Sequence, residues 1–279
     1  MLSRALNQVR RQVPRVASSI ARTQAVRSMT TAGGKLSELA TKFEHVDVLR
    51  YEHKNLKFTL SQMNHHADSL AVGFLECGLI PGDVVLSWLP SHFAEQHVLQ
   101  FACSKAGLTL YTLDPSLAVS DPEAAKKALT KALEITEANA LICQEAGSDT
   151  NYIRLVESVI PELRIFNQDD GMPFIAPQFP HLRLPIHTGF DYSDKAGMIP
   201  LSDMLCPTND LAASLKKTGK TVGEKTALMG ELEVGSDGVP TKKGKVLSND
   251  EVLKSGAWPE FNAVLKKEYT EVEGTGVAF

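Results

Sequence analysis

The amino-acid sequence predicts an α/β protein in three layers, with a parallel sheet covered by helices on both faces. Between about residues 46 and 166, short apolar runs of strand length alternate with longer amphipathic stretches of helical period, and turn or capping residues separate them. The chain of 279 residues is long enough to bury a core without disulfides or metals. Its 43% hydrophobic and 22% charged residues are the proportions of a globular protein.

Residue types at the ends of these segments predict where each element begins and ends. Thr59 opens a capping box, and Gly78 is the residue type that follows the end of a helix. Ser91 is expected to cap the next helix, and the pair Asp121-Pro122 to start the one after it. We expect strands at 46–51, 56–59, 84–89, 108–113, 140–143 and 163–166, and helices at 59–77, 92–106, 122–135 and 148–160.

The chain beyond residue 166 is predicted to be less regular. The α/β domain is assigned to residues 35–166, and an irregular connection at 167–226 follows, with Leu182–His187 as a candidate strand. A polar, lysine-rich stretch at 209–225 argues for surface connections or a linker. Residues 227–279 carry a glycine-containing segment and a final helix.

Residues 1–34 predict an import signal rather than part of the fold. They contain six arginines and no aspartate or glutamate, so the remainder holds 23 basic and 33 acidic residues, a net charge of −10. An arginine-rich, serine-containing, acid-free amphipathic start is typical of a mitochondrial transit peptide. Arg27-Ser28-Met29 precedes a predicted cut before Thr30, which a second trim would move by up to about ten residues. The alternatives are a plastid signal and a disordered basic tail.

Composition and spacing exclude several classes of function. The net charge of −4 gives no electrostatic case for nucleic-acid binding, and no run of 18 apolar residues predicts a membrane-spanning helix. The four cysteines contain no CxxC pair, and the histidines lack ligand spacing, so we expect no metal site. The short basic runs Lys216-Lys217 and Lys266-Lys267 predict at most a peripheral membrane association through a complex.

Five short pieces between residues 58 and 115 follow one another in an order that resembles a known family. They are Phe58–Asn64, Pro81-Gly82-Asp83, Leu89-Pro90, Lys105-Ala106-Gly107 and Tyr111–Pro115. In this order they resemble the N-terminal part of adenylate-forming enzymes, the acyl-CoA synthetases and AMP-dependent ligases. The resemblance implies the three-layer fold of that family's N-terminal subdomain.

The family signature is a Ser/Thr/Gly-rich loop followed by Pro-Lys-Gly, and the resemblance implies that this loop cradles the phosphates of ATP. The best match lies between Gly235 and Gly244, but Glu233, Val234 and Asp237 stand where the family has hydroxyl-bearing residues, and the Pro-to-Lys register is shifted. A carboxylate at 4 Å from a phosphate oxygen costs about 1–4 kcal/mol. We therefore expect a degenerate loop, or simply a charged surface turn, without ATP bound. The candidate phosphate-binding residues are Gly235, Ser236, Gly238, Lys242, Lys243 and Gly244.

Only 31 residues follow Ser248, whereas the resemblance implies further motifs that hold the ribose, Mg²⁺ and the carboxylate substrate. We therefore expect a non-catalytic mitochondrial protein on an acyl-CoA-synthetase-like scaffold, with no catalytic residue, cofactor or metal of its own. Its expected partners are other mitochondrial subunits, in the matrix or on the matrix side of the inner membrane. The alternative is an AMP-forming acyl-CoA synthetase in fragment form or completed by a partner chain.

Overall fold

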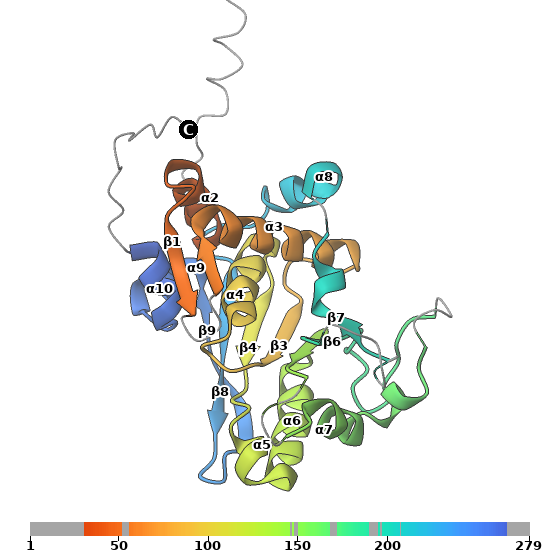
Figure 1. Ribbon diagram of the computed structural model, residues 1–279. Coiled ribbons are helices and arrows are strands. Elements are labelled where there is room, and N and C mark those ends of the chain that lie inside the picture. The colour runs from red at the N-terminus through yellow and green to blue at the C-terminus, as the bar shows by residue number, and fades with distance from the viewer. Residues whose placement is uncertain are drawn as a thin grey trace, which may run out of the picture.

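The computed structural model describes residues 31–51, 56–145, 147, 150–167, 172–189, 195, 197–206 and 208–266. Its main sheet has the strand order β7-β6-β5-β3-β4-β8-β9 and carries helices on both faces (Figure 1). The predicted three-layer α/β class is confirmed. The strands of this sheet are β3 (Val84–Trp88), β4 (Thr109–Thr112), β5 (Ala140–Cys143), β6 (Leu184–His187), β7 (Ile199–Pro200), β8 (Ala227–Val234) and β9 (Pro240–Ser248).

All neighbouring strands from β7 to β8 are parallel, and β9 returns antiparallel to β8. A second sheet holds only the antiparallel pair β1 (Asp47–Tyr51) and β2 (Leu56–Thr59). From β3 the chain first crosses to β4 on one side and then back to β5 on the other. The carboxyl ends of β3 and β5 therefore flank the point where the strand order reverses, which is where open α/β sheets usually bind ligands.

Alternating side chains of the central strands fill two separate cores. Val85 and Leu110 enter the core under one helical layer, whereas their neighbours Leu86 and Tyr111 enter the opposite core. The first layer consists of α2 (Ala32–Lys42), α3 (Leu60–Glu76), α4 (Ala94–Ala106) and α10 (Pro259–Lys266), with α8 (Thr208–Thr218) packed on α3. The opposite layer holds α5 (Leu117–Ser120), α6 (Pro122–Thr136), α7 (Tyr152–Val159) and the 3-10 turn η3 (Pro161–Arg164).

The helix caps that the sequence predicts from short-range patterns are present. The Thr59 side chain accepts from the Gln62 N–H at 3.2 Å, and the Gln62 side chain accepts from the Thr59 N–H at 3.0 Å. The Asp121 carboxylate accepts the N–H groups of Glu123 and Ala124 at the start of α6. These contacts satisfy donors that the first helical turn leaves without an intrahelical partner.

Two predicted elements are wrong. Ser91 does not cap α4, because residues 90–93 close a turn through the Phe93 N–H and the Pro90 carbonyl, and the helix begins only after Phe93. In place of the predicted strand at 163–166, the chain forms the end of the 3-10 turn η3 and the two residues that follow it. Pro161 stands at its first position, where the fixed φ of proline favours helical backbone.

The segment predicted as an irregular connection contributes to the main sheet. Within 167–226, β6 pairs with β5 over residues 184–187, and the two-residue strand β7 pairs with β6 at the edge of the sheet. The turn η5 (Leu201–Met204) and α8 follow. Sequence analysis also missed β8 and β9, which form a hairpin where only a loop-like segment was expected.

Most of the predicted transit peptide lies outside the described residues, which begin at Thr31. Thr31 caps α2, so residues 31–34 of the predicted 1–34 segment belong to the fold. Ala32, Gly33 and Gly34 are buried there. Within the part of the chain that the structure describes, no helix combines the length and the apolar character needed to cross a membrane.

Candidate phosphate-loop site

The residues predicted to bind phosphate lie on the hairpin of β8 and β9, at one edge of the main sheet. The structure places Gly235, Ser236 and Gly238 in the turn between the two strands. Lys242, Lys243 and Gly244 lie on β9 itself. The hairpin extends past the neighbouring strand β4 at the outer side of the sheet (Figure 1).

Backbone N–H groups of the turn are engaged inside the turn. The Gly235 N–H donates to the Val239 carbonyl at 2.9 Å, and the Gly238 N–H donates to the Gly235 carbonyl at 3.1 Å. The Val239 N–H donates to Oδ1 of Asp237 at 3.1 Å. A phosphate cradle needs such groups to point together at one external anion. Three N–H groups of this turn are therefore satisfied within it, and the Asp237 carboxylate occupies an acceptor position that a phosphate oxygen would take.

The glycines of the turn serve its backbone geometry. Gly238 has a φ of +78°, a left-handed conformation that side chains disfavour, and a Cβ there would lie 3.2 Å from Leu117 on α5. A Cβ on Gly235 would lie 2.8 Å from Oδ1 of Asp237. The Gly-Ser-x-Gly pattern that resembles a phosphate loop is thus also the pattern that a tight hairpin requires.

The lysines that follow the turn are directed to three separate carboxylates. Lys242 pairs with Glu233 at 3.0 Å, and Lys243 pairs with Glu137 at the end of α6 at 3.7 Å. Lys245 pairs at 3.0 Å with Glu251 on α9 (Asn249–Ser255). All three ammonium groups are exposed, so each pair contributes little stability. They do not converge on one point at the turn.

Ser248 and Glu251 form a second capping box where β9 enters α9. The backbone hydrogen bond from Ser248 is the main cause that lowers the pKa of the Glu251 carboxyl to about 2, and the hydrogen bond from Lys245 adds to it. The Leu-Ser pair of the family pattern thus survives as the start of a capped helix. At this point the match to the family pattern therefore reflects a helix cap.

Sequence analysis missed Asn249, which directly follows that pair and is fully buried. Its Oδ1 accepts the Ser104 hydroxyl at 2.6 Å and the Ala32 N–H at 3.3 Å, while its Nδ2 donates to the Thr226 carbonyl at 3.2 Å. Asn249 therefore joins α9 to α2, α4 and the entry of β8. Since its partners are distant in the sequence, no local pattern could have indicated this role.

Lys105, matched only as part of a Lys-Ala-Gly pattern, forms a second buried polar centre. Its side chain is 7% exposed, and its Nζ donates to Asp68 at 2.7 Å, to Asn64 at 2.9 Å and to Ser37 at 2.6 Å. Burial lowers the pKa of the Lys105 ammonium, and the Asp68 carboxylate opposes that change. The group connects α2, α3 and α4, so its evident role is to hold that helical layer together.

The carboxyl ends of β3 and β5, where a ligand would be expected, are filled by protein. Trp88 and Tyr152 pack edge to face there with ring centroids 5.2 Å apart, and both side chains are nearly inaccessible. Just beyond β5 and β6, Glu145 forms a short ion pair with buried Lys195. A Cβ on Gly189 would overlap that Glu145 carboxylate, which indicates tight packing. Among the described residues, no group of three or more metal-ligating side chains occurs.

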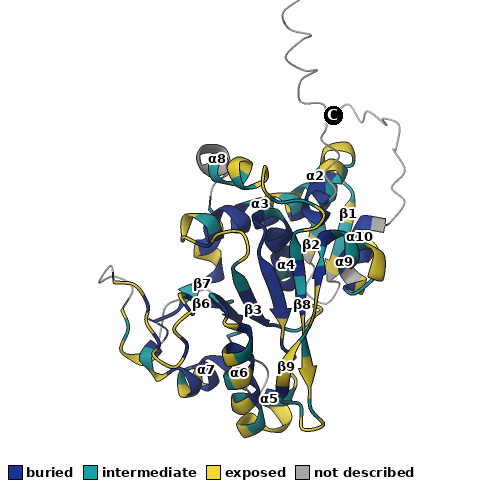
Figure 2. Ribbon diagram, turned by 180° about the vertical axis from the view of Figure 1, so that it is seen from behind, coloured by how far each residue is buried: buried dark blue, intermediate teal, exposed yellow. Residues whose placement is uncertain are grey.

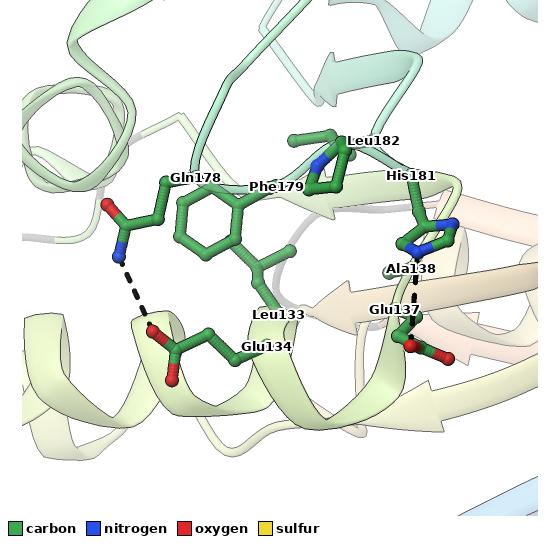
Figure 3. A pocket seen from close by; sticks show the side chains of 9 residues that line it. Leu133, Glu134, Glu137, Ala138, Gln178, Phe179, His181 and Leu182 are labelled. Atoms are coloured by element: carbon green, nitrogen blue, oxygen red, sulfur yellow. Dashed lines mark hydrogen bonds and ion pairs between the residues drawn. The ribbon is translucent and has the colours of Figure 1, made fainter.

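A shallow cavity of about 190 Å³ lies between the end of α6 and the chain at 178–182 (Figure 3). Leu133, Phe179 and Leu182 contribute apolar surface to it. Glu134 contacts Gln178 at 3.5 Å at one end, and Glu137 contacts His181 at 3.9 Å at the other. Two carboxylates on its rim make this cavity unsuited to a phosphate, because like charges repel.

Comparisons with known proteins identify relatives of this chain. The Bacillus subtilis (strain 168) protein named "Putative acyl-CoA synthetase YngI" is 25% identical over 231 residues, which are 82% of this chain and 39% of that protein. The Danio rerio "Medium-chain acyl-CoA ligase ACSF2, mitochondrial" is 23% identical over 128 residues, 46% of this chain and 20% of that protein. The chain thus spans well under half the length of these curated relatives.

Solved structures with the same fold are adenylate-forming enzymes. The acetoacetyl-CoA synthetase of Streptomyces lividans superposes with a TM-score of 0.60 at 15% identity, covering 84% of this chain and 37% of that one. The anthranilate CoA ligase AuaEII, solved with anthranoyl-AMP, gives 0.59 at 16% identity, covering 83% and 37%. The family model described as "AMP-binding enzyme" matches residues 36–175, half of this chain. The chain therefore belongs to the AMP-binding enzyme family.

Proposed function

We propose that this chain is a non-catalytic member of its family, which uses an acyl-CoA-synthetase-like scaffold as an accessory subunit of a mitochondrial assembly. The observation that carries the proposal is the hairpin turn at 235–239. Its N–H groups at Gly235, Gly238 and Val239 are hydrogen-bonded within the turn, and Asp237 supplies a negative charge there.

Phosphate binding at this turn would require several unfavourable changes at once. The internal hydrogen bonds of the turn would have to break, and a carboxylate would have to lie near the anion at a cost of about 1–4 kcal/mol. The lysines would also have to converge on the turn from their separate positions beside Glu233, Glu137 and Glu251. Transfer chemistry on a phosphoryl group depends on preorganised charge stabilisation, which this arrangement does not supply.

Two observations support a mitochondrial location. The first 34 residues are rich in arginine and free of acidic residues, as in transit peptides. One curated relative has a name that places it in mitochondria. A role in the matrix, or on the matrix side of the inner membrane, is part of this proposal.

The second candidate function is that of an acyl-CoA synthetase completed by another chain. Membership of the family favours it. In that case a partner would supply the ribose, magnesium and carboxylate contacts.

Native-gel profiling of mitochondria, with mass spectrometry of each gel slice, separates the two candidates. The accessory-subunit proposal predicts that the chain migrates with a large assembly and has no stoichiometric partner carrying the remaining ligase motifs. Migration with such a partner would favour the completed ligase instead. Migration as a free monomer would contradict the proposal of an accessory subunit.

A further inference from the structure

The outer edge of β9 pairs with no further strand among the described residues, although α6 packs against part of this strand. β9 is the last strand of the main sheet and runs for nine residues, so its inner side pairs with β8 and its outer side faces away from the sheet. Figure 2 shows β9 largely in the colour of exposed residues, in contrast to the buried central strand β3. Within the described residues, no backbone hydrogen bond is found from the outer side of β9 to a further strand.

An edge of this length presents a row of peptide donors and acceptors. Nine extended residues span about 30 Å, and such an edge is a template for a strand from another chain. Two exposed apolar side chains, Val234 and Val246, flank the same hairpin and are 53% and 43% exposed. An added strand would lie beside Val246 on β9 and would cover part of its surface as well as the peptide groups.

The side chains of β9 determine which strand fits. Lys242, Lys243 and Lys245 occupy the middle of the strand around Gly244. If two copies of this chain paired antiparallel about Gly244, Lys243 of one copy would lie opposite Lys245 of the other, and like charges directly opposite destabilise a sheet. The lysines therefore disfavour a second copy and favour a strand with carboxylates at these positions.

The existing partners of the lysines do not prevent this. Their ion pairs with Glu233, Glu137 and Glu251 are on the surface, where the Lys242 and Lys245 side chains are 67% and 62% exposed. Such pairs contribute little and re-form readily with a neighbouring carboxylate. Lysines on an edge also prevent unselective aggregation, which is consistent with an edge that accepts one type of strand and rejects others.

We propose that β9 is a docking edge for an extended, acidic segment of a partner protein, which adds to the main sheet as a further strand. The proposal deepens the accessory-subunit function and rests on it only for the existence of a partner. It requires no nucleotide, so its test is independent of ATP binding.

The test uses the purified full chain and fluorescently labelled peptides as long as β9. One peptide alternates glutamate and valine, a second alternates lysine and valine, and a third is the acidic peptide with an N-methyl group on every peptide bond, so that neither of its edges can donate. Fluorescence anisotropy is expected to give an affinity for the acidic peptide about tenfold higher than for the basic one. The N-methyl groups should abolish binding, because they remove the hydrogen-bond donors of an added strand.

Two charge-reversal variants complete the design. K242E/K243E/K245E changes the edge, whereas K216E/K217E/K220E changes the net charge equally on and just after α8, where the lysines are also exposed. The edge variant should lose about tenfold in affinity for the acidic peptide, while the α8 variant stays within about twofold. Circular dichroism of both variants checks that they remain folded.

Three results would overturn the proposal. These are undetectable binding of the acidic peptide, equal binding of its N-methylated form, and equal loss in the two variants. The last two would indicate a general electrostatic attraction without strand addition. None of these results bears on whether the hairpin turn binds ATP.

Discussion

The backbone N–H of Ala32 donates a hydrogen bond to Oδ1 of Asn249, 217 positions away in the chain, at 3.3 Å. The contact fastens the first turn of α2 to the helix that follows the hairpin. Ser104 on α4 donates to the same oxygen and itself accepts the N–H of Gly33 at 2.8 Å. The start of the described chain is therefore held by a buried polar group. Substitution of that group, which lies outside the hairpin turn, should lower the stability of the fold.

Asn249→Ala is expected to lower the free energy of unfolding by about 2–3 kcal/mol, because it removes the acceptor of the buried Ala32 N–H and of the Ser104 hydroxyl. Urea denaturation measures the change. Lys254→Ala on the same helix is the control, since its pair with Asp250 is exposed and contributes little to stability. Equal effects of the two substitutions would contradict the role assigned to Asn249.

Removal of residues 1–29 should leave the free energy of unfolding unchanged, whereas removal of residues 1–37 should lower it by about 3 kcal/mol or more. The longer deletion removes the Thr31 cap and the fully buried Leu36. For the same reason we expect processing in mitochondria to stop near Thr30, without a second trim into α2. N-terminal sequencing of the purified protein checks this, and a retained Met1 would refute the transit peptide.

Glu251 is expected to make the stability of the protein depend on acid pH. The pKa of its carboxyl is lowered from 4.5 to about 2 in the folded chain, chiefly by the Ser248 backbone hydrogen bond. The folded state therefore favours the ionised form, and its contribution is present above pH 4.5 and is lost as the pH falls towards 2. Glu251→Gln keeps a capping side chain but removes the titration, so its stability should fall less steeply over this range. Identical pH profiles of the two proteins, measured by thermal unfolding, would contradict the assignment.

Gly238→Ala should destabilise the protein by about 1–2 kcal/mol, because the left-handed backbone of the turn is unfavourable for a residue with a Cβ. The added methyl group would also press on Leu117. Gly223→Ala is the matched control: its Cβ would enter open space, and the expected change is within about 0.5 kcal/mol. If neither substitution changed the free energy of unfolding, the turn would tolerate a side chain at Gly238, and the need for glycine there would be contradicted.

Local signals in the sequence predicted the fold well. The capping box at Thr59 and the Asp121-Pro122 start are made by residues within three positions of each other, so their geometry follows from short-range chemistry. The buried runs of β3, β4 and β5 were recognisable because apolar residues line both faces of a parallel strand.

Elements determined by distant partners could not be predicted in this way. β8 carries Glu231 and Glu233 and β9 carries lysines, so neither resembles a buried strand, and their pairing is fixed by the turn and by β4. The phosphate-loop match rests on a pattern of glycines. Whether those N–H groups face outward or close a hairpin depends on backbone geometry, which a pattern of residue types does not specify.

Asp237→Asn tests whether the negative charge of the turn or its backbone geometry prevents ATP binding. Asparagine removes the negative charge but keeps an acceptor for the Val239 N–H. We expect this variant, like the unmodified chain, to bind no ATP, because the N–H groups of Gly235, Gly238 and Val239 remain engaged and the lysines remain dispersed. ATP binding by the variant alone, measured by calorimetry, would show that the carboxylate by itself blocks the site.

Isothermal titration of the unmodified full chain with Mg-ATP measures whether the hairpin turn binds nucleotide. At about 1 mM nucleotide, a detectable site requires a binding free energy of about −4 kcal/mol. We predict no heat of binding under these conditions, because the N–H groups of Gly235, Gly238 and Val239 are satisfied within the hairpin. Saturable binding of ATP in the micromolar range would contradict the account and would favour a working ligase site.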